Sequence, residues 1–210
     1  MKPLLPLLLS GLCLAADAPS ARVSGRVAIG MDQTVEMIGY YTHIAGFQAP
    51  LFASGTAEKT AYFSFRTERA PVQTTNDGTG FKLKQSGEEL LHVYYHPLPD
   101  RDFAKPDTFA EVQMIASYKT RGGEASVTPG GQFSYSGDIS LHASSDFVVE
   151  GKKYNLRDLG LEFTLKASGT SPSIEELGRQ ASTGKFTVNF TGSAVAKPAQ
   201  PPPPPDTRSR

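Results

Sequence analysis

Apolar and polar side chains alternate along most of this chain, as they do in strands that bury one face and wet the other. Phe186, Val188 and Phe190, for example, are separated by Thr187 and Asn189. Segments that we read as strands lie at 23–29, 34–44, 60–66, 80–84, 90–96, 109–118, 132–141, 147–150, 161–166 and 185–195. The pattern predicts about ten strands, most of them with one polar face.

Short breaks rich in turn-forming residues separate these segments. Asn-Asp-Gly stands at 76–78, Arg-Gly-Gly at 121–123 and Pro-Gly-Gly at 129–131. Such brief connections favour antiparallel pairing. Segment 171–178 differs, because a Ser cap, early acidic residues and a final Gly predict a helix of two turns. We therefore predict an all-β fold, an antiparallel β-sandwich or β-barrel of about ten strands with one short helix, since both arrangements bury the apolar faces.

The beginning of the chain has the pattern of an export signal. Lys2 precedes an apolar run at 4–14, which is too short for a bilayer span of roughly 20 residues, and small residues follow it. We expect residues 1–18 to be a signal peptide that is cleaved after Ala18 or shortly before it. The mature protein is then exported, secreted or periplasmic, without a transmembrane segment.

The mature chain is expected to form one domain and a tail. About 190 residues suit a single antiparallel β domain at 19–196. The tail at 197–210 contains five consecutive prolines, which favour an extended, unpacked segment. The only cysteine, Cys13, lies inside the signal; its removal excludes disulfide, thiolate-zinc and cysteine-nucleophile chemistry, and lipid attachment there is the alternative.

Charge argues against a polyanionic partner. Lys and Arg together number 21, as do Asp and Glu, and the basic residues are scattered along the chain. A nucleic-acid binder concentrates positive charge on one surface, so we predict no nucleic-acid partner.

The strongest candidate for chemistry is the acidic loop that joins segments 90–96 and 109–118. Asp100, Asp102 and Asp107 present carboxylates within a short, proline-stiffened stretch, as a calcium loop does. The alternative is that these side chains cap turns, a common role of Asp in loops. We predict no cofactor other than calcium at this loop.

No catalytic motif occurs in the sequence, and this favours binding over catalysis. The leading prediction is an exported non-catalytic β protein that binds a small apolar ligand or a cell-envelope or extracellular partner. One alternative is a carboxylate-dependent secreted hydrolase, in which acidic residues such as Asp100, Asp102, Asp107 and Glu111 meet in a cleft. Another alternative is a structural surface module with a proline-rich spacer.

Overall fold

The computed structural model describes residues 18–197 except 31, 79, 111 and 172–184. The described residues therefore leave out nearly all of the predicted helix at 171–178, of the predicted signal peptide at 1–18 and of the proline-rich tail at 197–210. Within the described part of the chain, no helix is long and apolar enough to cross a membrane.

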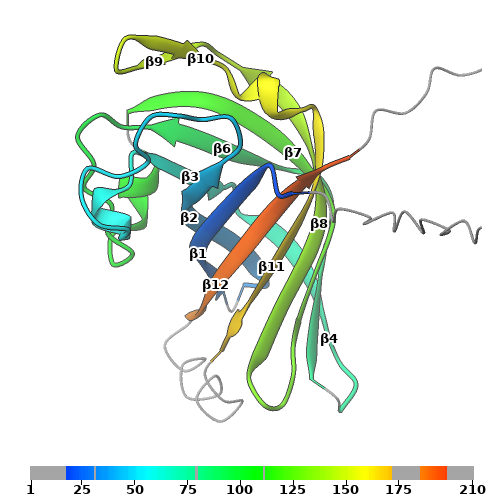
Figure 1. Ribbon diagram of the computed structural model, residues 1–210. Helices are drawn as coiled ribbons and strands as arrows, with labels where there is room; N and C mark the ends of the chain where they lie inside the picture. Colours follow the sequence, from blue (N-terminus) through cyan, green and yellow to red (C-terminus); the bar gives the residue numbers. More distant parts are fainter. Residues whose placement is uncertain (1–17, 31, 79, 111, 172–184, 198–210) are drawn as a thin grey trace, which may run out of the picture.

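The fold is all-β, as the alternation predicts (Figure 1). The strands are β1 (Ala21–Gly30), β2 (Thr34–Ile44), β3 (Phe63–Thr67), β4 (Ala70–Asn76), β5 (Phe81–Gln85), β6 (Glu89–Tyr95), β7 (Gln113–Val127), β8 (Gln132–Ser144), β9 (Phe147–Val149), β10 (Lys152–Tyr154), β11 (Glu162–Thr170) and β12 (Lys185–Ala196). Short 3-10 turns are η1 (Glu58–Thr60), η2 (Pro106–Phe109) and η3 (Leu156–Leu159).

Eight strands close into an antiparallel barrel. The circuit runs β1, β2, β3, β6, β7, β8, β11, β12 and returns to β1 through the β1–β12 pairing. Strand β4 follows β3 after a short break and pairs with β2, and strand β5 precedes β6 by a short break and pairs with β7. Strands β4 and β5 also pair with each other, at one end of the barrel. The closed circuit shows that, of the two predicted arrangements, the barrel is the one that forms. Its closure leaves no exposed sheet edge in the circuit.

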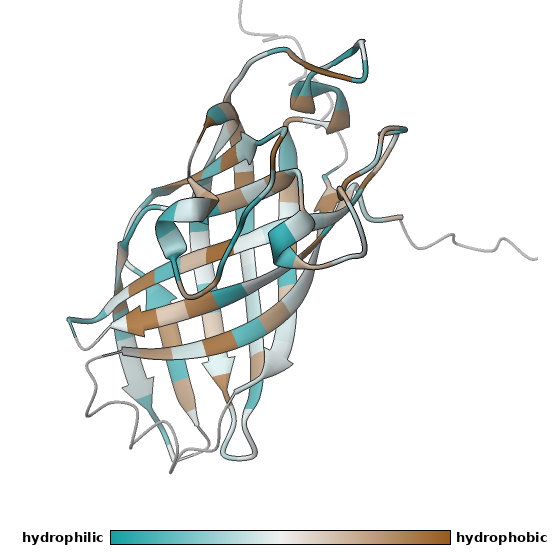
Figure 2. Cartoon of the chain, turned by 90° about the vertical axis from the view of Figure 1, so that its left-hand side faces the viewer, coloured by the Kyte–Doolittle hydropathy of each residue, from teal (hydrophilic) through white to brown (hydrophobic). Residues whose placement is uncertain are grey.

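The barrel has two differently built ends. We call the end that carries the separate hairpin β9–β10 the upper end, and the end that carries the β4–β5 and β7–β8 hairpins the lower end (Figure 1). In Figure 2, brown apolar and pale or teal polar bands alternate along the barrel strands. This alternation puts one set of side chains inside the barrel and the other on its outer surface.

Two glycines make the barrel narrow at its middle. Gly25 on β1 pairs with Gly39 on β2. A Cβ at Gly25 would lie 2.7 Å from Phe190 Cζ, and one at Gly39 would lie 2.5 Å from Phe65 Cζ. The two rings therefore occupy the space that side chains on these glycines would need, and they fill the centre of the barrel.

Most predicted strands correspond to strands of the barrel, and two differences have a clear origin. The segment predicted at 109–118 becomes a strand only from Gln113, because Pro106 opens the 3-10 turn η2 and Phe109 ends it, buried against the barrel wall. The segment predicted at 60–66 begins at Phe63 for a similar reason, since Thr60 ends η1. Strands β4 and β10 were not predicted from the sequence.

Candidate functional site: the interior of the barrel

The acidic loop predicted to bind calcium lies on the outer surface of the barrel. Asp100 is exposed, Asp102 accepts a hydrogen bond from the backbone N–H of Ala104 at 2.9 Å, and Asp107 is ion-paired with Arg66 at 2.7 Å. No three acidic, His or Cys side chains among the described residues are grouped to hold a metal ion. The loop thus uses Asp102 to cap a turn and Asp107 in an ion pair, and calcium at this loop stays a prediction.

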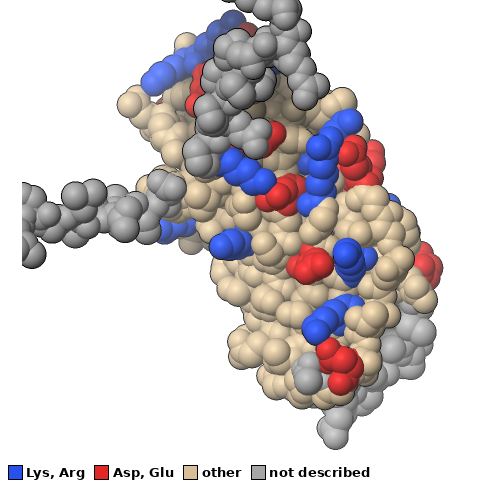
Figure 3. Space-filling view, turned by 90° about the vertical axis from the view of Figure 1, so that its right-hand side faces the viewer, with Lys and Arg blue, Asp and Glu red and all other residues tan. Residues whose placement is uncertain are grey.

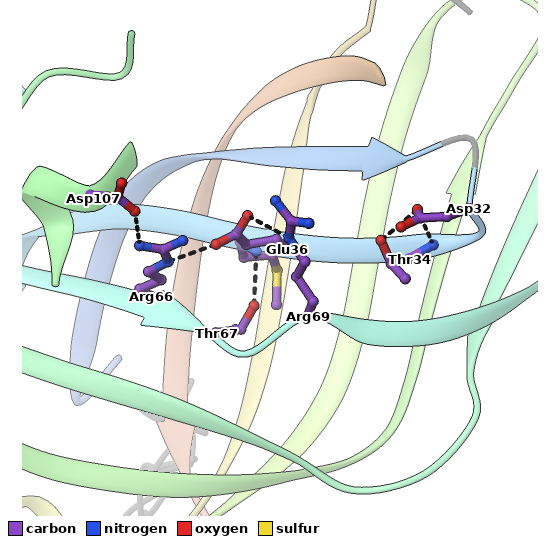
Figure 4. A network of polar contacts seen from close by, with 8 residues as sticks. Asp32, Thr34, Glu36, Arg66, Thr67, Arg69 and Asp107 are labelled. Atoms are coloured by element: carbon purple, nitrogen blue, oxygen red, sulfur yellow. Dashed lines mark hydrogen bonds and ion pairs between the residues drawn. The ribbon is translucent and has the colours of Figure 1, made fainter. Parts of the chain in front are cut away.

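An ion-pair network fastens this loop to the barrel (Figure 4). Glu36 on β2 is buried, and one carboxylate oxygen accepts a hydrogen bond from Arg66 Nε at 2.6 Å. The other oxygen lies 3.7 Å from Arg69 Nε, and Arg66 also holds Asp107 of the loop. Beside the network, Phe109 packs in a second apolar cluster outside the barrel wall. The network is therefore a structural clamp between the loop and the wall.

Positive and negative side chains are mixed on the face of the barrel that Figure 3 shows. On the face in Figure 3, Lys and Arg side chains stand next to Asp and Glu side chains. Lys82 pairs with Asp77 at 2.7 Å and Lys84 with Glu124 at 3.9 Å. Exposed pairs of this kind contribute little to stability.

The upper end of the barrel is closed by a segment that is not part of the hydrogen-bonded circuit. We call residues 145–161 the lid; it comprises β9, β10 and η3. Strand β9 pairs only with β10, and aromatic contacts hold the hairpin in place. The ring of Tyr154 lies 4.4 Å from that of Phe47, and the ring of Phe147 lies 5.7 Å from that of Phe63. The lid is thus attached at its centre by packing and by the hydrogen bond from Lys152 Nζ to Gln48 Oε1 at 2.9 Å, and near its ends by backbone bonds.

An apolar cavity lies beneath the lid, and we call it the upper cavity. A volume of about 40 Å³ is available there to the centre of a water-sized sphere. Its lining is almost wholly apolar: Ala21, Val23, Phe65, Leu91, Ile139, Leu156, Leu159, Phe163, Leu165 and Ala194, together with the tyrosines Tyr41 and Tyr118. Burial raises the pKa of both phenols, so they are neutral at every physiological pH.

A second cavity lies inside the lower half of the barrel, and we call it the lower cavity. Its available volume is about 30 Å³, and its walls combine apolar side chains with Gln85, Glu89 and Tyr135. Glu89 is only 5 % exposed. Its Oε2 and the Tyr135 hydroxyl are buried and have no hydrogen-bond partner among the described residues. Unpaired buried polar atoms are costly, and this lower cavity contains two of them.

Burial changes the acid–base behaviour of this cluster. Removal of the Glu89 carboxyl from water raises its pKa to about 7; a hydrogen bond from Thr120 opposes the rise and the negative charge of Glu68 adds to it. Desolvation also raises the pKa of Tyr135, and the charge of Glu89 reinforces this. Glu89 thus changes its charge near neutral pH, within a largely apolar cavity.

An aromatic layer separates the two cavities. The ring of Phe190 lies 6.5 Å from that of Phe65 and 6.4 Å from that of Phe133. Phe65 lines the upper cavity and Phe133 the lower one. The barrel therefore offers two small interior sites of different polarity.

Sequence reasoning missed Glu89, although the chain contains a signal for it. Glu89, Leu91 and Val93 alternate on one strand face, and the two hydrophobic residues identify that face as the interior. Burial of a carboxyl among apolar side chains costs free energy, so an acidic residue on the apolar face of a strand is a candidate for a functional role. That Glu89 lies near Gln85 and Tyr135 could be known only from the register between the strands.

Searches of known protein families, of curated protein sequences and of solved structures find no match to this chain.

Proposed function

We propose that this protein is a non-catalytic binding protein that takes a small apolar ligand into the upper cavity. The observation that supports this most directly is an apolar cavity at the mouth of a closed barrel, covered by a lid that stands outside the barrel's circuit. Ligand sites in barrels commonly occupy this position. Tyr41 and Tyr118 are the only polar side chains in its lining, so apolar contact supplies the binding energy.

The size of the upper cavity makes the lid part of the proposal. One water needs roughly 10–15 Å³ of such volume, so the closed form holds only a few non-hydrogen atoms. A larger ligand requires the lid to move away. Its two ends are tied to the barrel by Ser145 N–H to Ile115 O at 2.9 Å and by Leu141 N–H to Leu161 O at 2.7 Å. Movement of the segment between these bonds leaves every barrel strand paired.

Titration with N-phenyl-1-naphthylamine, a neutral apolar fluorophore, tests the site, followed by competition with straight-chain alcohols. Burial of each methylene contributes about 0.8 kcal/mol, so each added carbon is expected to tighten binding about fourfold until the cavity is filled. Ala194→Leu fills the cavity and is expected to weaken binding, whereas Leu159→Ala enlarges it and is expected to admit longer alcohols. Ala104→Leu makes the same change as the first variant on the exposed loop and serves as the control.

Two results would contradict the proposal. One is the absence of fluorophore binding by the wild-type chain. The other is equal binding by Ala194→Leu, Leu159→Ala and the wild type, which would locate the fluorophore elsewhere.

We propose separately that the protein is exported, because this proposal rests on the signal-peptide pattern of residues 1–18 and not on the cavity. The intact mass of the protein recovered from the exported fraction tests it: cleavage at or shortly before Ala18 supports export, and a retained leader in the cytoplasm contradicts it. The hydrolase alternative has less support, since the fold engages Asp102 in a turn and Asp107 with Arg66.

A further inference from the structure

Three oxygen atoms converge on the lower cavity. Gln85 donates its amide N–H to Thr120 Oγ1 at 2.9 Å, which leaves its carbonyl oxygen on the side of Gly123. A Cβ at Gly123 would lie 2.6 Å from this oxygen and 2.9 Å from the Tyr135 hydroxyl, so both oxygens lie within 3 Å of one point. Glu89 lines the same cavity with an unpaired carboxyl oxygen.

The strand irregularities around the cavity build this convergence. Glu89 begins β6 directly after the break between β5 and β6, and pairs with Thr120 of β7. The register of β7 against β8 then shifts between Arg121 and Glu124. Gly123 thereby faces the interior as a residue without a side chain, and the Gln85 carbonyl oxygen and the Tyr135 hydroxyl pack into the space that a Cβ would need.

The chemistry of the cavity calls for a donor with several N–H groups. An ionised Glu89 and the Gln85 carbonyl are acceptors, and the Tyr135 hydroxyl can accept as well. A primary ammonium group offers three N–H donors and a positive charge, whereas a water molecule offers two donors and no charge. No Lys or Arg of the described residues forms an ion pair with Glu89.

The walls and the volume limit what the ammonium group carries. Val27, Val35, Met37, Val72 and Leu83 line the cavity and suit a short alkyl chain. One water needs roughly 10–15 Å³ of such volume, so about 30 Å³ holds two or three non-hydrogen atoms. Methylammonium and ethylammonium match this size.

We propose that the lower cavity is a binding site for the protonated amino group of a small primary alkylamine, with Glu89 as its counter-ion and Gln85 and Tyr135 as its remaining hydrogen-bond acceptors. The site is distinct from the upper cavity and is independent of the apolar ligand proposed there, because Phe65, Phe190 and Phe133 form the layer between them.

Binding is expected to depend on pH through Glu89. The groups that act on this carboxyl are the hydroxyl of Thr120 on β7 and the carboxylate of Glu68 between β3 and β4, and Tyr135 on β8 is itself affected by the charge of Glu89. The amine pairs only with the ionised carboxyl. With a pKa of about 7, about 3 % of Glu89 is ionised at pH 5.5 and nearly all at pH 8.5, so the apparent affinity is expected to rise about thirtyfold between them.

Calorimetric titration of the full chain with ethylammonium chloride tests the proposal, with potassium chloride and ethanol as controls for charge and for size. We expect binding of ethylammonium alone, tighter at pH 8.5 than at pH 5.5. Glu89→Gln and Gly123→Ala are expected to abolish it, the first by removing the counter-ion and the second because its Cβ would displace the Gln85 oxygen and the Tyr135 hydroxyl. Glu88→Gln, one residue away on the exposed side, is the matched control and is expected to bind as the wild type does.

A measurement on the wild-type chain keeps the test independent of how the variants fold. The carbon-13 signal of the Glu89 carboxyl reports its titration directly, and ethylammonium is expected to lower its midpoint, because a bound cation favours the ionised form. An unchanged midpoint, equal binding by Glu89→Gln, or occupancy by water alone at millimolar ethylammonium would overturn the proposal. Fluorophore binding in the upper cavity would persist in each of these cases, so the two failures are distinguishable.

Discussion

Replacement of Glu89 by Gln should make the stability of the barrel less dependent on pH. The folded protein holds the Glu89 carboxyl at a pKa of about 7, whereas the ordinary value of 4.5 applies in the unfolded chain. Between these values the folded state keeps a proton that the unfolded state has lost, so wild-type stability falls as the pH rises. Each pH unit in this window costs about 1.4 kcal/mol, and the whole window therefore costs about 3 kcal/mol.

Gln has the shape of a protonated Glu and cannot ionise, so Glu89→Gln escapes this loss. The variant and the wild type are expected to be similar in stability near pH 4.5, and the variant is expected to be more stable by about 3 kcal/mol at pH 8. Urea unfolding between pH 4.5 and 8, followed by far-UV circular dichroism, measures the difference. The chain has no Trp and eight Tyr, and tyrosine fluorescence supplies a second probe.

Glu88→Gln is the control with the opposite sign. Arg121 and Lys119 hold the pKa of the exposed Glu88 below its ordinary value, so its charge stabilises the fold above pH 4.5 and this contribution is lost as the pH falls. Its replacement should therefore slightly lower stability at neutral pH. The reasoning about Glu89 is refuted if Glu89→Gln and the wild type give parallel stability curves from pH 4.5 to 8, because Glu89 would then ionise in the fold as it does in water.

Two further substitutions test the narrow waist of the barrel and the clamp on its outer wall. Gly25→Ala is expected to lower the free energy of unfolding by about 2 kcal/mol, because its Cβ would meet the ring of Phe190, whereas Gly130→Ala, with its nearest atom 4.0 Å away, is expected to be neutral in the same denaturation assay. Arg66→Met leaves the buried Glu36 with a weaker partner and is expected to cost about 2–3 kcal/mol and to speed hydrogen exchange in the loop at 96–110; unchanged exchange there would show that the clamp does not hold the loop.

The two interior cavities differ in how they are closed and in the polarity of their walls. The upper cavity is closed by a lid whose central contacts are aromatic, and its opening leaves the barrel strands paired. The lower cavity lies inside the hydrogen-bonded barrel, at the break between β5 and β6, and contains a carboxyl that is costly to bury. A mutation that weakens the lid is thus expected to alter ligand exchange, and one at Glu89 is expected to alter pH dependence.

The alternation of side chains was sufficient to predict the all-β class and most of the strands. Phe186, Val188 and Phe190 show why: each adjacent residue in a strand points to the opposite face, so the period of two is visible in the chain itself. Barrel closure was not visible in this way. It depends on the pairing of β1 with β12, which are far apart in sequence, and a sandwich satisfies the same local pattern.

From the sequence alone, most of the strands and the apolar face of each could be identified, whereas β4, β10 and the buried Glu89 were not. The folded barrel as a whole brings Gly25 to Gly39, places Phe65 and Phe190 in the space beside them, and forms the upper and the lower cavity. It also decided that Glu89 lines the same cavity as Tyr135. Strand faces follow from local stereochemistry, whereas these meetings follow from the register between strands, which the packing of the whole barrel sets.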